Sequence, residues 1–113
     1  MKALRKHTVL KLMNEEVLST FAQYLPVLRA AAKLSQEKLG KMVGLSKEAI
    51  SHLEQGKSKF RLYYYIAMRS IFEEISCINQ DEGITNYVLE IVDSKMDKTY
   101  NYWFEAILDI EGD

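Results

Sequence analysis

The sequence has few of the residue types that cross-link, interrupt or anchor a chain. Its single cysteine, Cys77, excludes a disulfide framework and a thiolate zinc cluster within the chain. One proline and five glycines exclude Gly/Pro-rich linkers, collagen-like repeats and a β-sandwich with many turns. The longest apolar run, Leu62 to Met68, is too short to cross a membrane, and basic residues among the first twelve interrupt any signal-peptide core. We therefore expect a cytoplasmic protein without membrane contact, in which Cys77 is buried as a small hydrophobic side chain.

The charges are divided unevenly along the chain, although the formal net charge is only -1. Residues 1–62 hold twelve Lys and Arg against five Asp and Glu, a net charge of +7. Residues 63–113 hold three against eleven, a net charge of -8. This asymmetry predicts that the first part meets a polyanion. The alternative is two solvated faces of opposite sign that partly attract each other.

Apolar residues recur at three- and four-residue steps along most of the chain, and strand-type alternation is absent. This spacing predicts a first long helix over about 15–33, with Asn14 as its N-cap. Because Pro26 lies inside that pattern and lacks a backbone N–H, we expect a kink or a restart there. Further helical patterns cover about 35–43, 46–54, 62–75, 84–92 and 96–108. The sequence therefore predicts an all-α protein of about six helices.

The two short helices over 35–43 and 46–54 have start and stop signals of their own. Ser35 and Ser46 are predicted N-caps, because their hydroxyl oxygens can accept hydrogen bonds from the first-turn backbone N–H groups. Gly44 ends the first of these helices, where a left-handed residue is needed. Ser94 and Asp97 resemble a capping box before the last helix. Two short helices joined by a Gly-containing turn, the second rich in small polar side chains, describe a helix-turn-helix.

A set of spaced positions carries a resemblance to a known family: Leu28-Arg29, Leu34-Ser35-Gln36-Glu37-Lys38-Leu39, Val43-Gly44-Leu45-Ser46, Ile50-Ser51 and Leu53-Glu54-Gln55-Gly56-Lys57. With these positions, residues 18–75 resemble the Cro/C1-type (XRE) helix-turn-helix family. The resemblance implies a λ-repressor-like bundle of four to five helices, here with additional C-terminal amphipathic helices. Gly40 replaces the alanine usual in the family. In a helix interior it should cost about 1 kcal/mol unless a close approach of the chain requires glycine.

The second helix of the motif is the predicted reader of base edges, because a helix fits the major groove and its N-terminal residues face the bases. Lys47 could donate to guanine, and Glu48 could accept from cytosine. Ser51 and His52 follow one turn later. We predict base contacts by these four residues. The alternatives are a solvated helix start for Lys47 and Glu48 and a covered helix flank for His52.

Phosphate contacts are predicted for a second set of residues: Gln36, Ser46, Lys57, Ser58, Lys59 and Arg61. The family resemblance assigns this role to Gln36, and the free backbone N–H groups at a helix start also suit a phosphate. Four donors within five residues after the recognition helix favour counterion release over a merely soluble loop. The family positions of Arg29 and Glu54 face one another, so the resemblance implies a partly buried ion pair there.

The acidic C-terminal part is expected to lie away from DNA, which repels it. Its aromatic-rich apolar face predicts a homodimer contact, with an intramolecular cap in a monomer as the alternative. The predicted interface residues are Tyr87, Ile91, Tyr100, Trp103, Phe104, Ile107 and Leu108. The expected division of the chain is a basic arm over 1–14, a DNA-binding domain over 15–76 and a helical dimerisation region over 77–113.

These patterns predict a sequence-specific regulator of transcription, of bacterial or phage type, that binds double-stranded DNA as a homodimer on an inverted repeat. The alternative is an antitoxin that represses its own operon and binds a toxin through the acidic part. A third possibility keeps the fold but binds protein in place of DNA. An enzyme is not expected, because the sequence has no Cys/His pairing, no Gly-rich phosphate loop and no cluster of metal ligands. No catalytic residue, metal or cofactor is therefore predicted.

Overall fold

The computed structural model describes residues 6–80 and 82–95, and every regular element in this part of the chain is a helix. The helices are α1 (Lys6–Ala32), α2 (Gln36–Val43), α3 (Lys47–Glu54), α4 (Leu62–Asn79) and a fifth helix over residues 83–95. The predicted all-α class is confirmed. In the described ranges, no helix combines the length and the apolar character that crossing a membrane requires. The sixth predicted helix, over 96–108, lies outside the described residues.

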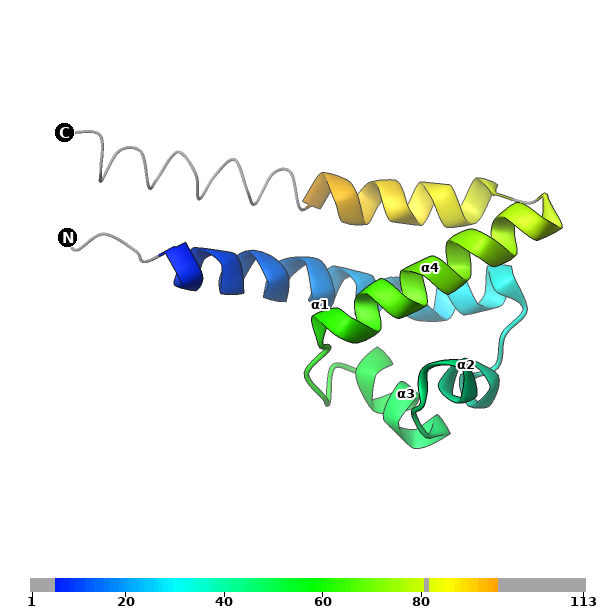
Figure 1. Cartoon of the computed structure of the whole chain (residues 1–113), viewed down its shortest axis with the longest axis horizontal. Coiled ribbons are helices and arrows are strands. Elements are labelled where there is room, and N and C mark those ends of the chain that lie inside the picture. The colour runs from blue at the N-terminus through cyan, green and yellow to red at the C-terminus, as the bar shows by residue number, and fades with distance from the viewer. Residues whose placement is uncertain (1–5, 81, 96–113) are drawn as a thin grey trace.

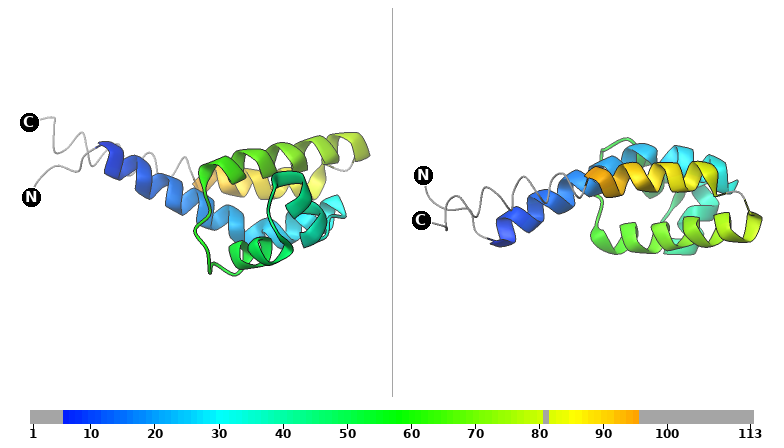
Figure 2. Two further views of the ribbon diagram at one scale, coloured as in Figure 1. Left: turned by 60° about the horizontal axis from the view of Figure 1, so that its bottom comes forward. Right: turned by 90° about the horizontal axis from the view of Figure 1, so that it is seen from above.

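The helices are arranged around α1, which forms the long axis of the molecule (Figure 1). α4 crosses α1, and the short helices α2 and α3 lie together on one side of this pair. The helix over 83–95 lies on the other side and runs antiparallel to α1, as the views in Figure 2 also show. The C-terminal part of the described chain is therefore separated from α2 and α3 by the body of the domain.

Phe21 of α1 lies at the centre of the core and is fully buried. Its ring packs edge-on against Tyr65 of α4, with ring centroids 4.9 Å apart, and against Phe60, at 5.6 Å. Such T-shaped pairs contribute about 0.5–1.5 kcal/mol each beyond the area that they bury. The other side chains with no exposed surface come from every helix: Leu25, Leu28, Leu39, Ile50, Met68, Phe72 and Val92. One continuous core therefore fixes α3 and the helix over 83–95 to the same support.

The expected start of the first helix is wrong. α1 begins at Lys6 rather than after Asn14, so most of the predicted basic arm is helical and continuous with the domain. α1 also passes through Pro26 without ending. A proline removes one hydrogen bond of the helix, but its neighbour Leu25 and Leu28 are both fully buried. Their burial offsets this loss, because each such side chain stabilises the fold by about 1.5–3 kcal/mol.

Two other expectations about the second half of the chain are also wrong. Ser94 lies inside the helix over 83–95, so it does not cap a later helix. α4 continues to Asn79, where Gln80 ends it with a left-handed backbone (φ 55°). Cys77 lies in the added last turn of α4 and is exposed rather than buried. The last turn of α4 extends beyond the core, so Cys77 is exposed although its side chain is apolar.

The predicted caps of the two short helices are confirmed. The Ser35 hydroxyl oxygen accepts a hydrogen bond from the Lys38 backbone N–H at 3.0 Å. The Ser46 hydroxyl oxygen accepts one from the Ala49 backbone N–H at 3.1 Å. Gly44 ends α2 with a left-handed backbone (φ 78°). These local bonds determine where α3 begins, and with it the position of its first exposed residues.

Gly40 is required by a close approach inside the α2–α3 turn. A Cβ atom at this position would collide with the Leu45 carbonyl group and would lie 3.2 Å from its carbon atom. The collision involves backbone, and the Leu45 N–H also donates to the Gly40 carbonyl oxygen at 2.8 Å. Glycine in a helix costs about 1 kcal/mol relative to alanine. The chain carries this cost at position 40 because the tight turn between α2 and α3 leaves no room for a side chain there.

We expect Gly40→Ala to lower the free energy of unfolding by about 2 kcal/mol, because the overpacking exceeds the gain in helix propensity. Urea denaturation followed by circular dichroism measures this change. Gly83→Ala is the matched control, because nothing lies near a Cβ atom at Gly83. The control should stay within about 0.5 kcal/mol of the parent protein. A Gly40→Ala variant as stable as the parent would contradict the close approach.

The helix over 83–95 is held by apolar packing and by ion pairs at its C-terminal end. Val88, Leu89 and Val92 belong to the core. The Arg69 guanidinium donates two hydrogen bonds to the Asp93 carboxylate, at 2.6 and 2.8 Å. The hydrogen bond to Asp93 raises the pKa of Arg69 well above its usual value, against the opposing effect of burial. This helix is therefore fixed to α4 as well as to α1.

Candidate nucleic-acid interface

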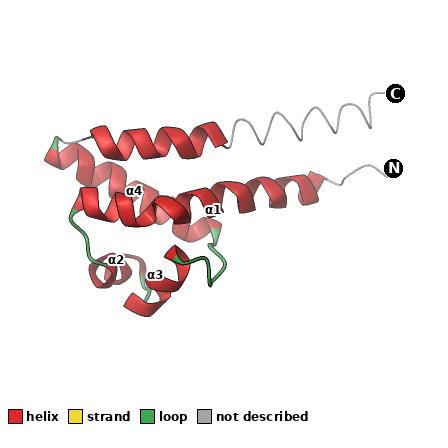
Figure 3. Ribbon diagram, turned by 180° about the vertical axis from the view of Figure 1, so that it is seen from behind, coloured by secondary structure: helices red, strands yellow, loops and turns green. Residues whose placement is uncertain are grey.

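The α2–α3 unit presents one side of α3 to solvent. Ile50 and Leu53 are buried on the inner side of α3. The turn between the two helices is closed by the hydrogen bond from Leu45 to Gly40 described above. Because α2 and α3 lie on the side of α1 and α4 that faces away from the helix over 83–95, this described helix does not cover α3 (Figure 3). Among the described residues, the outer side of α3 is therefore open to a large ligand.

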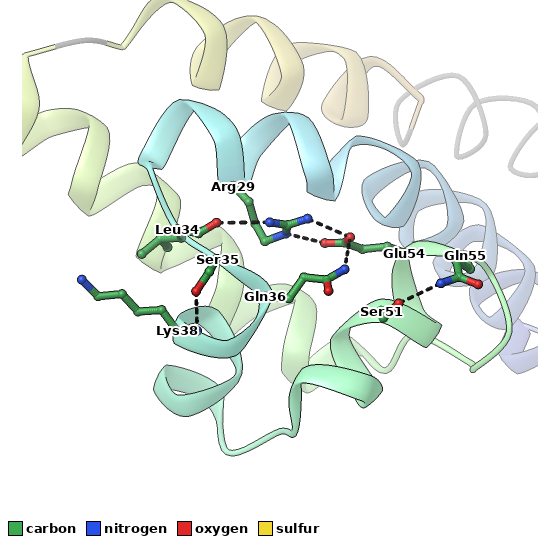
Figure 4. Close-up of polar contacts among 8 residues, drawn as sticks. All are labelled: Arg29, Leu34, Ser35, Gln36, Lys38, Ser51, Glu54 and Gln55. Carbon is green, nitrogen blue, oxygen red and sulfur yellow. Dashed lines mark hydrogen bonds and ion pairs between the residues drawn. The ribbon is translucent and has the colours of Figure 1, made fainter.

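Of the four predicted base contacts, Lys47, Glu48 and His52 are exposed on α3. Ser51 is half-buried, and its hydroxyl oxygen accepts a hydrogen bond from the Gln55 side-chain Nε2 at 2.7 Å (Figure 4). All four residues therefore lie on one short helix. Gln55, at the end of this helix, supports Ser51 by its hydrogen bond, and the sequence analysis had not assigned Gln55 a role. The four-residue separation of Ser51 and Gln55 was the available signal, since side chains at this spacing are neighbours on a helix.

The predicted phosphate contacts that follow α3 lie in an ordered loop. Lys57, Ser58, Lys59 and Arg61 are all exposed. The buried ring of Phe60 holds the loop between them. The first part of the loop is closed by a hydrogen bond from the Lys57 N–H to the His52 carbonyl oxygen at 2.9 Å. This turn requires a left-handed backbone, which Gly56 supplies (φ 72°). Three cationic side chains are thus displayed next to the end of α3.

Arg29 and Glu54 are paired in the structure, and Gln36 joins them (Figure 4). The Arg29 guanidinium donates to the Glu54 carboxylate through Nε and, at 3.0 Å, through Nη2. Gln36 Nε2 donates to the same carboxylate at 2.9 Å, and Arg29 Nη1 donates to the Leu34 carbonyl oxygen at 3.2 Å. The Glu54 side chain is only 7% exposed. This cluster ties α1 and the start of α2 to the end of α3.

Gln36 thereby has a role that the sequence did not suggest, because its amide points toward Glu54. One N–H of the amide is used in this bond, and the second N–H is left for another acceptor. Ser46 is similar, since its hydroxyl oxygen caps α3 while its O–H can still donate. Both phosphate contacts stay predictions.

A family model described as helix-turn-helix matches residues 28–71 of the chain. The resemblance to the Cro/C1-type (XRE) helix-turn-helix family is thus confirmed over residues 28–71. The match includes the whole of α2, α3 and the following loop, and the fold is of the λ-repressor-like all-α kind. It supports a DNA-binding regulatory function for this part of the chain. Neither a curated protein nor a solved structure matches the chain significantly.

The described ranges contain no group of three or more His, Cys, Asp or Glu that could hold a metal ion.

Of the predicted dimer contacts, Tyr87 is 66% exposed and Ile91 is half-buried. The others lie outside the described residues: Tyr100, Trp103, Phe104, Ile107 and Leu108.

Proposed function

We propose that the protein is a sequence-specific regulator of transcription, of bacterial or phage type, that inserts α3 of its helix-turn-helix domain into the major groove of double-stranded DNA. The observation that carries this proposal is the outer side of α3, where Lys47, Glu48 and His52 are exposed. Ile50 and Leu53, buried on the opposite side, hold the helix in place. A rigid helix with polar side chains facing outward fits the groove and can discriminate base edges.

Phosphate contacts by the loop after α3 fix the orientation of the recognition helix. Lys57, Lys59 and Arg61 provide charge, and Ser58 provides a hydroxyl donor. Gln36, oriented by Glu54, and Ser46 donate from the starts of α2 and α3. These contacts carry no sequence information, but they supply much of the affinity through the release of counterions.

We further propose that the protein binds an inverted repeat as a homodimer. Two recognition helices about 34 Å apart meet successive turns of the major groove. Ile84 and Tyr87 are exposed on the helix over 83–95, and by helical spacing Ile91 shares their side. An exposed apolar stripe of this kind is typical of a protein interface. The helix that carries this stripe lies on the side of α1 opposite α2 and α3, so a partner bound to it leaves the proposed DNA-binding surface free (Figure 1).

The same stripe also fits a different protein partner, which keeps the antitoxin as the second candidate function. A toxin bound there would engage the acidic part of the chain while the basic domain binds the operator. Purification of the native protein from its own cells distinguishes the two, because an antitoxin would be recovered with a second, dissimilar chain in fixed ratio.

The proposed function predicts a steep dependence of DNA affinity on salt. If each protomer contacts about four phosphates, the logarithm of the affinity of a dimer falls against the logarithm of the salt concentration with a slope of about -7. A monomer with the same contacts would give a slope of about -3.6. The duplex for this titration comes from selection of bound genomic fragments, which should yield an inverted repeat. A flat dependence would point to a protein ligand in place of DNA.

A further inference from the structure

Gln55, at the end of α3, is joined to Ser51 by two hydrogen bonds. Its backbone N–H donates to the Ser51 carbonyl oxygen at 3.1 Å, and its side-chain Nε2 donates to the Ser51 hydroxyl oxygen at 2.7 Å (Figure 4). The first bond places Gln55 one helical turn beyond Ser51, and the second holds the two side chains together. The predicted base and phosphate contacts do not include Gln55, although this bond ties it to one of them.

The backbone around Gln55 is fixed on both sides. Glu54, directly before it, pairs with Arg29 of α1. Gly56, directly after it, has the left-handed backbone of the turn that ends α3. The Gln55 side chain therefore starts from a fixed point. Its bond to Ser51 is formed before any ligand arrives, so little freedom is lost on binding.

The bonded pair lies on the outer side of α3. Spacings of three and four residues put Glu48, Ser51 and Gln55 on one side of the helix. The buried Ile50 and Leu53 occupy the other side. Gln55 is exposed, and Ser51 is half-buried beside it. In the proposed complex with DNA, the hydrogen bond from Gln55 to Ser51 thus lies on the side of α3 that meets the bases.

The direction of this bond decides what the Ser51 hydroxyl offers to a base. A serine hydroxyl that rotates freely can meet a donor or an acceptor, because it has one O–H and two lone pairs. Gln55 Nε2 occupies one lone pair of the Ser51 oxygen. Among the described residues, no acceptor receives the Ser51 O–H, whereas the Thr20 hydroxyl on α1 donates to the Glu16 carbonyl oxygen at 2.9 Å. When DNA excludes water, the Ser51 O–H needs an acceptor on the base.

We propose that Gln55 is a positioning residue that makes the Ser51 hydroxyl a hydrogen-bond donor, so that α3 selects a base with an acceptor at this place. Guanine and thymine present keto oxygens as acceptors in the major groove, whereas adenine and cytosine present amino donors at the corresponding place. This inference rests on the proposed function and deepens it, because it names the class of base edge that Ser51 reads.

Reversal of the bond in Gln55→Glu tests the assignment. A carboxylate has no N–H, so the Ser51 O–H must donate to it and the Ser51 oxygen is left as an acceptor. Selection of bound duplexes is carried out with the full-chain parent, Ser51→Ala and Gln55→Glu. At the position where Ser51→Ala loses its preference, the parent should select a keto base and Gln55→Glu an amino base.

Fluorescence anisotropy then measures the affinity for duplexes that differ only at this position. One hydrogen bond gained or lost corresponds to about a fivefold change in affinity. The ratio of the affinities for keto and amino bases should therefore change by at least about fivefold between the parent and Gln55→Glu. In Gln55→Ala the Ser51 hydroxyl rotates freely, and the ratio should fall to about twofold or less. A purely structural role of Gln55 would lower all affinities alike and leave this ratio unchanged.

Gln23→Glu is the matched control for the added charge. Gln23 is exposed on α1 and lines the same hollow as Gln55, but Ser51 does not line this hollow. The control therefore adds a carboxylate near Gln55 and leaves the bond to Ser51 in place. It should keep the base preference of the parent, with a common decrease of all affinities. Circular dichroism checks that each variant is folded.

An unchanged base preference in Gln55→Glu or in Gln55→Ala would overturn the inference. The same holds if no position depends on Ser51, or if Gln23→Glu shifts the preference as much as Gln55→Glu does. Each of these outcomes leaves the proposed function intact, because the parent still binds its selected duplex. A parent protein that selects no duplex would overturn the proposed function itself, and this inference with it.

Discussion

Replacing Lys47 and Lys59 together by glutamate should abolish binding of the selected duplex, with a loss of affinity of more than about a thousandfold at moderate salt. Lys47 is exposed at the first position of α3, and Lys59 is exposed in the loop that follows it. Each replacement removes an attraction to the duplex and adds a repulsion. A base contact contributes about 1–3 kcal/mol, and a factor of ten in affinity corresponds to about 1.4 kcal/mol. Fluorescence anisotropy of a labelled duplex measures the loss.

Lys41→Glu is the matched control for a single charge reversal. Lys41 lies on α2 outside the predicted contacts, and its ion pair with Glu37 is long (3.5 Å) and exposed. Such a pair contributes little to stability. We expect this variant to keep its affinity within about threefold, whereas Lys47→Glu and Lys59→Glu should each lose about tenfold or more. An unchanged affinity of the double variant, with its circular dichroism spectrum intact, would falsify the proposed surface.

Glu54→Ala should lower the free energy of unfolding by about 3–5 kcal/mol, the cost of leaving one charge of a buried pair without its partner. The Arg29 side chain is only 17% exposed, so water does not replace the lost carboxylate fully. Gln36 loses its acceptor in the same step. The loss is a large part of the stability expected for one domain of this size. Thermal and urea denaturation measure it.

Two controls test whether the loss of stability comes from breaking the buried ion pair or from removing any carboxylate. Glu37→Ala removes an exposed carboxylate and should cost less than about 0.5 kcal/mol. Arg29→Met combined with Glu54→Leu removes both charges, and this double variant should lose less stability than Glu54→Ala alone. A loss below about 1 kcal/mol in Glu54→Ala would show that the cluster of Arg29, Glu54 and Gln36 does not hold α3.

The starts and ends of α2 and α3 were predictable from sequence because their signals are local. Ser35 and Ser46 bond to N–H groups three residues away, and Gly44 supplies a backbone conformation of its own. The partnership of Arg29 and Glu54 came from the family resemblance, which carries information about contacts between distant residues. The outward position of Lys47, Glu48 and His52 follows from the apolar pattern of α3, since Ile50 and Leu53 must face the core.

The remaining features depend on contacts between residues far apart in the sequence. Asn14 was predicted to begin α1 as its N-cap but lies inside the helix, because a single N-cap signal contributes only about 1 kcal/mol. Cys77 is exposed because the end of α4 extends past the core. The need for glycine at position 40 was visible only once the Leu45 carbonyl group lay against it.

The sequence by itself determined that the chain is helical, that two short helices form a helix-turn-helix and that cations follow the second of them, because these properties arise from neighbours within a few residues. Only the tertiary structure decided the length of α1, the inward bond of Gln36, the support of Ser51 by Gln55 and the antiparallel docking of residues 83–95. These depend on which surfaces meet in the folded chain, and the free energy of such long-range packing exceeds that of any single local signal.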